Sequence, residues 1–149
     1  MTQAVLFYGY NLNDPEEGRW TIEEDRNYGD FHATWFTNSD ETRNGQLISM
    51  NGAILEGAGV DLTDVSGFNY DGLVERLCGV SVLTYGHSGK LYYGIGLASS
   101  VYVADDWAPM PVAPGSNIDS HEPLAKALKA LGMTPEAPHP SWILAPSEL

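Results

Sequence analysis

The apolar residues of this chain follow two different spacings, and this mixture most limits the folds open to it. Residues 4–12 are rich in β-branched and aromatic side chains and run into an Asn-Asp-Pro signal, which predicts a buried strand followed by a turn. Residues 120–131 instead place four apolar side chains at helical spacing, with Ser120 as the cap, Pro123 in the first turn and Gly132 as the stop. The chain therefore combines strands and helices.

A second helix and a hairpin are predicted in the middle of the chain. Residues 69–77 have helical spacing, begin with Asn69 as a cap and are followed by a glycine that can end the helix. Residues 80–85 and 91–103 predict the two arms of a hairpin. Glycines inside the second arm, at Gly94 and Gly96, indicate a bend or a close approach of backbones.

The segment before these elements is predicted to be mostly strand and loop. Residues 31–37 predict a strand, residues 38–45 a hairpin loop, and residues 46–55 the returning strand, broken at Asn51-Gly52. Residues 56–67 predict an irregular surface loop. Together these expectations describe one α+β domain over residues 1–149, with a bent antiparallel sheet of about four to six strands and two or three helices packed on it.

Three shorter segments complete the prediction. Thr21 and Glu24 have the spacing of a capping box, which favours a short helix beginning there. Residues 105–117 contain three prolines and predict a connecting loop. The tail from residue 135 to residue 149 is expected to lie extended against the body of the protein.

The charge of the chain is strongly negative and unevenly distributed. Twenty Asp and Glu stand against seven Lys and Arg, for a formal net charge of −13 and a pI near 4.3. Residues 1–75 hold fourteen of the acids and three of the bases. Nucleic acid and anionic membrane surfaces repel such a chain, so we expect neither as a direct partner.

Carboxylates on a rigid surface can take the place of DNA phosphates in a cationic groove. Alternate residues of a strand lie about 6.6 Å apart, and residues three or four apart on a helix about 5 to 6 Å, which is comparable to the phosphate spacing of a nucleic-acid strand. The mimic then gains the same counterion release as DNA. The acids expected to contact such a partner are Asp14, Glu16, Glu17, Glu23, Glu24, Asp25, Asp30, Asp40 and Glu41. The competing interpretation is that they only keep the protein soluble.

The cysteine count and the first residues bear on the compartment. A single cysteine, Cys78, excludes an internal disulfide and is expected to be packed rather than reactive. The first residues lack the basic region and cleavage site of a secretory signal. No apolar run approaches the roughly 18 residues of a membrane-spanning helix. We therefore expect a cytoplasmic protein.

Motifs for catalysis, cofactors and metals are weak. Residues 86–90 approach the Gly-x-Ser-x-Gly pattern of a nucleophile elbow, but Lys90 replaces the last glycine and the turn joins two strands. Gly94 and Gly96 lack the third glycine of a dinucleotide-binding loop. The four histidines do not have the spacing of metal ligands. We expect no cofactor and no metal.

Residues 70–107 resemble small uncharacterised proteins of tailed phages. The resemblance covers about a quarter of the chain and rests on Leu73-Val74-Glu75-Arg76-Leu77 and on residues 82–87 and 97–107. Small acidic phage proteins include inhibitors that imitate DNA to block host gyrase, restriction enzymes, repair glycosylases or CRISPR effectors. The resemblance itself implies no activity. Together with the acidic composition, it leads us to expect a non-enzymatic phage-type DNA mimic that binds a host DNA-binding protein, such as DNA gyrase, in the host cytoplasm.

Two other interpretations stay open. One is a small enzyme or ligand-binding domain with a pocket beside the bent hairpin. That pocket would be formed by Tyr85, His87, Ser88 and Asp105 or Asp106. The other is a structural component that forms a homodimer through exposed aromatic residues such as Trp20 and Trp142.

Overall fold

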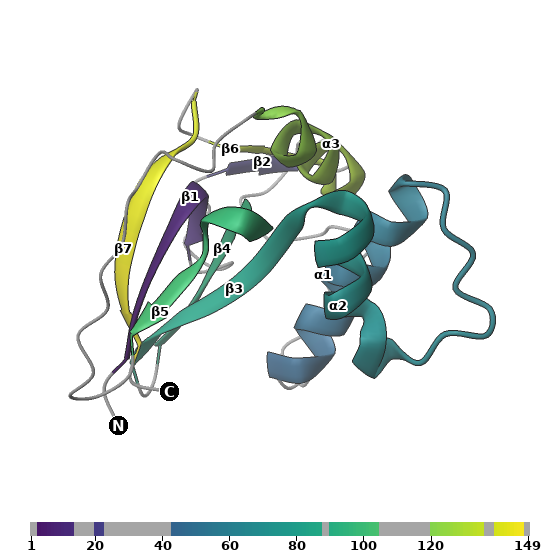
Figure 1. Ribbon diagram of the computed structural model, residues 1–149, viewed down its shortest axis with the longest axis horizontal. Coiled ribbons are helices and arrows are strands. Elements are labelled where there is room, and N and C mark those ends of the chain that lie inside the picture. The colour runs from purple at the N-terminus through teal and green to yellow at the C-terminus, as the bar shows by residue number, and fades with distance from the viewer. Residues whose placement is uncertain are drawn as a thin grey trace.

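The computed structural model describes residues 3–13, 20–22, 43–87, 90–104, 120–135 and 139–147. Its strands are β1 (Gln3–Asn13), β2 (Trp20–Ile22), β3 (Val80–His87), β4 (Lys90–Leu97), β5 (Tyr102–Ala104), β6 (Met133–Pro135) and β7 (Ser141–Ser147). Its helices are α1 (Arg43–Gly57), α2 (Tyr70–Leu73) and α3 (Glu122–Leu131), with shorter turns η2 (Gly67–Asn69), η3 (Val74–Cys78) and η4 (Ala98–Ser100). Figure 1 shows the larger sheet at one end of the molecule and α1 and α2 at the other.

Strand β1 organises a curled sheet of five strands in the order β4-β3-β7-β1-β5. One edge of β1 pairs antiparallel with β7, from Gln3↔Ser147 to Gly9↔Ser141. Its other edge pairs first with β5 and then with β4. Strands β3 and β4 form the predicted hairpin, and a parallel pairing of Gly86 with Ser147 brings β3 to β7. The predicted α+β class, with a bent antiparallel sheet and helices, is confirmed.

The inside of the curled sheet is filled by the fully buried ring of Phe7. It packs in a small buried cluster with Val5, Tyr85 and Ala145. The glycines of β4 make room for this ring, because a Cβ added at Gly94 would lie 2.7 Å from Phe7 Cζ and one at Gly96 would lie 2.8 Å from Phe7 Cδ2. The close approach at these glycines is therefore made by a side chain, the ring of Phe7, and not by another backbone as the sequence pattern predicted.

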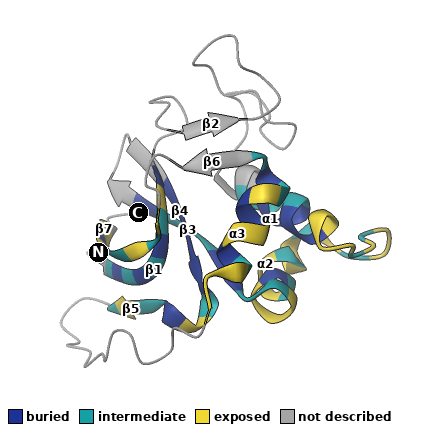
Figure 2. Cartoon of the chain, turned by 90° about the horizontal axis from the view of Figure 1, so that it is seen from above, coloured by how far each residue is buried: buried dark blue, intermediate teal, exposed yellow. Residues whose placement is uncertain are grey.

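The helices pack against the other face of β3 and β4 and form a second, larger core. Because side chains alternate along a strand, Tyr93, Ile95 and Leu97 point away from Phe7 and toward the helices. They meet buried residues of α1, η3 and α3, among them Met50, Leu55, Val74, Leu124 and Leu128. Figure 2 shows buried residues along this boundary between the hairpin and the helices.

Two helices occur where the sequence predicts them. Helix α3 buries the whole predicted apolar stripe, its Glu122 N–H donates to Ser120 Oγ at 3.1 Å, and it ends at Gly132 with a φ of +68°. The helix predicted over residues 69–77 is formed by α2 and the π-helical turn η3, and it ends at Gly79. Asn69 occupies the N-cap, but its side chain makes no capping hydrogen bond there.

Residues 46–55 are not the predicted returning strand; they form the larger part of α1. The helix buries Met50, Ile54 and Leu55. The Asn51-Gly52 pair, which predicted a break, is buried within the helix, and a Cβ at Gly52 would lie 3.2 Å from the ring of Tyr70. Glycine here permits the close approach of α2 rather than a turn. Residues 43–45 of the predicted loop over residues 38–45 are helical too.

The predicted strand over residues 91–103 is interrupted by η4. Ser100 is fully buried there, and its hydroxyl donates to the Leu97 carbonyl at 2.7 Å and accepts from the Tyr8 N–H at 2.9 Å. The hydroxyl thus satisfies the Tyr8 N–H, which lies between the part of β1 that pairs with β5 and the part that pairs with β4. A buried serine thus divides one predicted strand into two.

Four further expectations concern the remaining segments of the chain. Thr21 lies in β2, which pairs with β6, so the short helix predicted to begin there is not formed at this residue. The tail predicted to lie extended against the body is extended over β7, where it forms a strand within the sheet. The strand predicted over residues 31–37 and the loop predicted over residues 105–117 lie outside the described residues.

Candidate functional site

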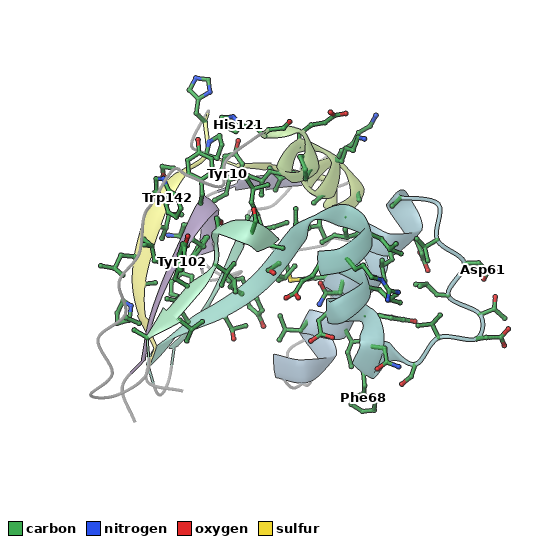
Figure 3. The ribbon with its side chains drawn as sticks, viewed as in Figure 1. Tyr10, Asp61, Phe68, Tyr102, His121 and Trp142 are labelled. Carbon is green, nitrogen blue, oxygen red and sulfur yellow. The ribbon has the colours of Figure 1, made fainter. Side chains whose placement is uncertain are left out.

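The acids expected from the sequence to contact a partner lie outside the described residues. They are Asp14, Glu16, Glu17, Glu23, Glu24, Asp25, Asp30, Asp40 and Glu41. Within the described part, exposed acids gather between the end of α1 and η3, in residues 56–76, which we call the acidic hairpin. Its charged residues are Glu56, Asp61, Asp64, Asp71, Glu75 and Arg76, and each is exposed. Figure 3 places Asp61 on the loop that projects away from the larger sheet.

The first turn of the acidic hairpin is fixed by the way α1 ends. Gly59 has a φ of +82°, in the region that favours glycine. Its N–H donates to the Glu56 carbonyl at 3.0 Å, and the Val60 N–H donates to the Leu55 carbonyl at 3.0 Å. This pair of bonds is a Schellman motif, and the Val60 side chain then packs on the larger core. The chain therefore leaves α1 in a fixed direction, toward Asp61.

The carboxylate of Asp61 is held in a local turn. Its Oδ1 accepts from the Thr63 hydroxyl at 2.5 Å and from the Thr63 N–H at 3.0 Å. These bonds, the side-chain bond first, lower the pKa of Asp61 below its ordinary value of 3.8. Asp61 is therefore ionised at neutral pH, and its charge has a fixed position.

Replacing Thr63 by valine is expected to raise the pKa of Asp61 toward 3.8, as measured by an NMR titration of this carboxyl group. Because folding lowers this pKa, the carboxylate stabilises the fold above the unfolded-state pKa, and that contribution is lost as the pH falls through the folded-state pKa. Thr63→Ser keeps the hydroxyl and should keep the low pKa. An unchanged pKa in Thr63→Val would contradict this account of the turn.

The second half of the acidic hairpin is tied to the sheet. The Ser81 hydroxyl donates to Glu75 Oε1 at 3.0 Å, which links β3 to η3.

Beside these acids the Phe68 side chain is 83% exposed, and Figure 3 shows it pointing away from the body of the protein. Fixed acids next to an exposed aromatic ring suit contact with another protein. Phe68 stands between Gly67 and Asn69 with no periodic neighbours, so the sequence pattern did not single it out.

A groove of about 810 Å³ lies between α1, η3 and α3. It combines apolar side chains such as Leu77 with Lys126 and Lys129, and Lys126 makes an exposed ion pair with Glu122 at 3.2 Å. Burial raises the pKa of the Cys78 thiol in its wall, so this cysteine is protonated at neutral pH and is a poor nucleophile. The volume of the groove is that of a small-molecule site. Cys78 in its wall is not activated as a nucleophile.

Only part of the alternative pocket falls within the described residues. Tyr85 is buried inside the curled sheet, where its hydroxyl donates to Asn11 Oδ1. His87 ends β3, and Ser88, Asp105 and Asp106 lie outside the described residues. Over the described ranges, no three His, Cys, Asp or Glu side chains lie close enough to share a metal ion.

An aromatic cluster lies on the outward side of β1. Tyr8 Oη and His121 Nε2 are 3.1 Å apart, and the Trp142 ring meets the Tyr8 ring edge-on with centroids 5.5 Å apart. Burial, and then the neighbouring Tyr8, raise the pKa of Tyr10 above its ordinary value of 10.0. The sequence predicts an exposed Trp142, and the structure shows it half-buried. The sequence pattern did not identify Tyr8 and His121 as its neighbours.

No protein-family model, no curated protein and no solved structure matches this chain. Of the helices among the described residues, none is both long enough and apolar enough to cross a membrane. The function therefore has to be argued from the surfaces of the described residues.

Proposed function

We propose that the protein is a non-enzymatic inhibitor that binds the basic DNA-binding groove of another protein in the place of DNA. The observation that carries the proposal is the acidic hairpin, which presents the exposed carboxylates of Glu56, Asp61, Asp64, Asp71 and Glu75 on one segment. A surface of this composition attracts a cationic groove. The acids between residues 14 and 41 add to the negative charge of the same half of the chain.

The fixed geometry of the acidic hairpin favours such binding. The Schellman turn at Gly59, the hydrogen bonds between Thr63 and Asp61, and the hydrogen bond from Ser81 to Glu75 hold three parts of it before any partner arrives. Less conformational freedom is then lost on association. Phe68 supplies an apolar contact next to the charges, of the kind that slows dissociation once charges have brought two surfaces together.

The proposal is tested by capturing partners from a bacterial lysate on the immobilised full chain, with identification by mass spectrometry. We expect a DNA-binding protein that is released as salt rises from about 50 mM to about 500 mM, since screening weakens contacts between exposed charges. Added duplex DNA should displace the same protein. DNA gyrase is the first defined target to assay: the chain should inhibit supercoiling, and excess DNA should relieve the inhibition.

Two outcomes would count against DNA mimicry. One is the absence of any salt-sensitive partner, and the other is a partner that duplex DNA does not displace. The better candidate would then be a ligand-binding domain that uses the groove between α1, η3 and α3. Its volume of about 810 Å³ falls in the range of about 300 to 1,000 Å³ that is common for small-molecule sites.

A further inference from the structure

A second surface of the protein is opposite in character to the acidic hairpin. Residues paired directly across an antiparallel sheet point to the same side of it. The outward side of β1, β5 and β7 therefore combines Ala4, Leu6, Tyr8, Tyr102, Ala104, Trp142, Leu144 and Pro146. None of these side chains is charged. We call this surface the uncharged face.

The uncharged face is partly open to solvent, although Tyr8 also packs against the larger core. Leu144 is 72% exposed, Pro146 is also exposed, and the other members are half-buried. The alternate residues of the same strands, such as Phe7 and Ala145, are buried inside the curled sheet. Strands β1 and β7 are thus apolar on both sides, whereas the solvated side of an antiparallel sheet is normally polar. An open apolar patch of this kind marks an interaction surface.

We propose that the uncharged face joins two copies of this chain into a symmetric dimer. Each copy carries a formal charge of −13, so two copies can meet closely only where the contact itself adds no like charge. In Figure 3, Tyr102 and Trp142 of the uncharged face lie at the opposite end of the molecule from Asp61 and Phe68. The dimer therefore keeps its two acidic hairpins far apart and leaves both open.

A second copy fits this face better than a charged partner does. A cationic partner would be drawn to the acids and would meet no counter-charge on the uncharged face. A copy presents the same neutral surface, so the contact is self-complementary, and two such surfaces can stack as the sheets of a sandwich do. The rings of Tyr8 and Trp142 are already packed against each other, so they lose little freedom on association.

The size of the uncharged face sets the strength of the dimer. Strands β1 and β7 contribute seven paired residues each and β5 three. At about 3.3 Å per residue and about 4.8 Å between strands, they outline a plan area of roughly 270 Å². Stable interfaces bury about 800 Å² on each partner, and weak ones less than about 600 Å². The dimer is therefore weak, and its population rises with protein concentration over the micromolar range. This inference is independent of the proposed function.

Sedimentation velocity of the full chain from about 5 µM to about 500 µM tests the proposal. The wild type should shift from monomer toward dimer over this range. Leu144→Glu should raise the dissociation constant at least about tenfold, because it places two charges in an apolar contact. Leu144→Lys should do the same although it lowers the net repulsion, which separates the loss of apolar contact from a simple effect of charge. Circular dichroism should show unchanged folding, since Leu144 is exposed.

Phe68→Glu is the matched control, because Phe68 is also highly exposed but lies on the acidic hairpin. It should leave the dimer intact. Rising salt should strengthen the dimer by screening the repulsion between copies, whereas it should weaken binding of a basic partner. The two proposals can therefore fail separately. A wild type that stays monomeric at about 500 µM would overturn the dimer and leave the face to a partner of another sequence. Dimerisation that survives Leu144→Glu, or is lost in Phe68→Glu, would overturn it too.

Discussion

Replacing Phe7 by alanine is expected to lower the free energy of unfolding by about 3 to 5 kcal/mol. The ring is fully buried inside the curled sheet, where Gly94 and Gly96 leave space that only an aromatic ring fills. Two glycines without side chains cannot collapse into the cavity, so the cost should fall at the upper end of this range. Urea unfolding followed by tryptophan fluorescence measures it.

The close contact between Phe7 and Gly96 can be tested in the same series. Gly96→Ala alone should destabilise the protein by about 1 to 3 kcal/mol, because its Cβ would strike the ring. In the Phe7→Ala background that penalty should fall, which gives a coupling energy of at least about 0.5 kcal/mol. Phe68→Ala, at an exposed ring, should change stability by less than about 0.5 kcal/mol. A similar loss at Phe7 and Phe68 would contradict the described core.

Neutralising the acidic hairpin is expected to weaken partner binding about tenfold to a hundredfold. The change is the triple variant Asp61→Asn, Asp64→Asn and Asp71→Asn, in which each exposed charge contributes up to about 1 kcal/mol. Asparagine keeps the oxygen that accepts from Thr63, so the turn at Asp61 should persist. The measurement is the affinity for the captured partner over a range of salt, and the variant should show a smaller dependence on salt.

Two further variants show which acids make the contact. Glu122→Gln removes an exposed acid of α3 outside the acidic hairpin and should change binding little. Changing Glu16, Glu17, Glu23 and Glu24 to Lys reverses the charge of acids outside the described residues. If this second variant loses binding while the triple asparagine variant binds like wild type, the hairpin is not the contact surface. If both lose binding, the partner spans both groups of acids.

The parts of the fold that could be predicted are those whose signals are local and agree with one another. The sequence of helix α3 has Ser120 as a capping residue, a first-turn proline, an apolar stripe and Gly132, and these signals agree on one helix. In the structure His121 occupies the N-cap, and the Ser120 hydroxyl accepts from the Glu122 N–H. Helix α1 has the opposite property, because Asn51-Gly52 predicts a turn locally. Its burial against Tyr70, which decides the structure, is a contact between separate segments.

The arrangement of the sheet and of the candidate surfaces depends on such distant contacts. The spacing of residues 141–147 does not show that they pair with β1, because strand pairing is specified by packing and not by local preference. The uncharged face could not be predicted for the same reason. Only residues 56–67 of the acidic hairpin were predicted as a surface loop, and its later part falls in the helix predicted over residues 69–77. The exposure of Phe68 depends on which segments lie beside it.

The pairing of β1 with β7 also has a consequence for how the protein folds. Contacts such as Gln3↔Ser147 join residues from opposite ends of the chain, and closing so long a loop is costly in chain entropy before the pairing forms. Folding should therefore be slow for the size of the domain. During synthesis, β1 emerges long before β7 and carries an apolar, unpaired edge until its neighbour is made. Until then, that edge is open to pairing with other chains.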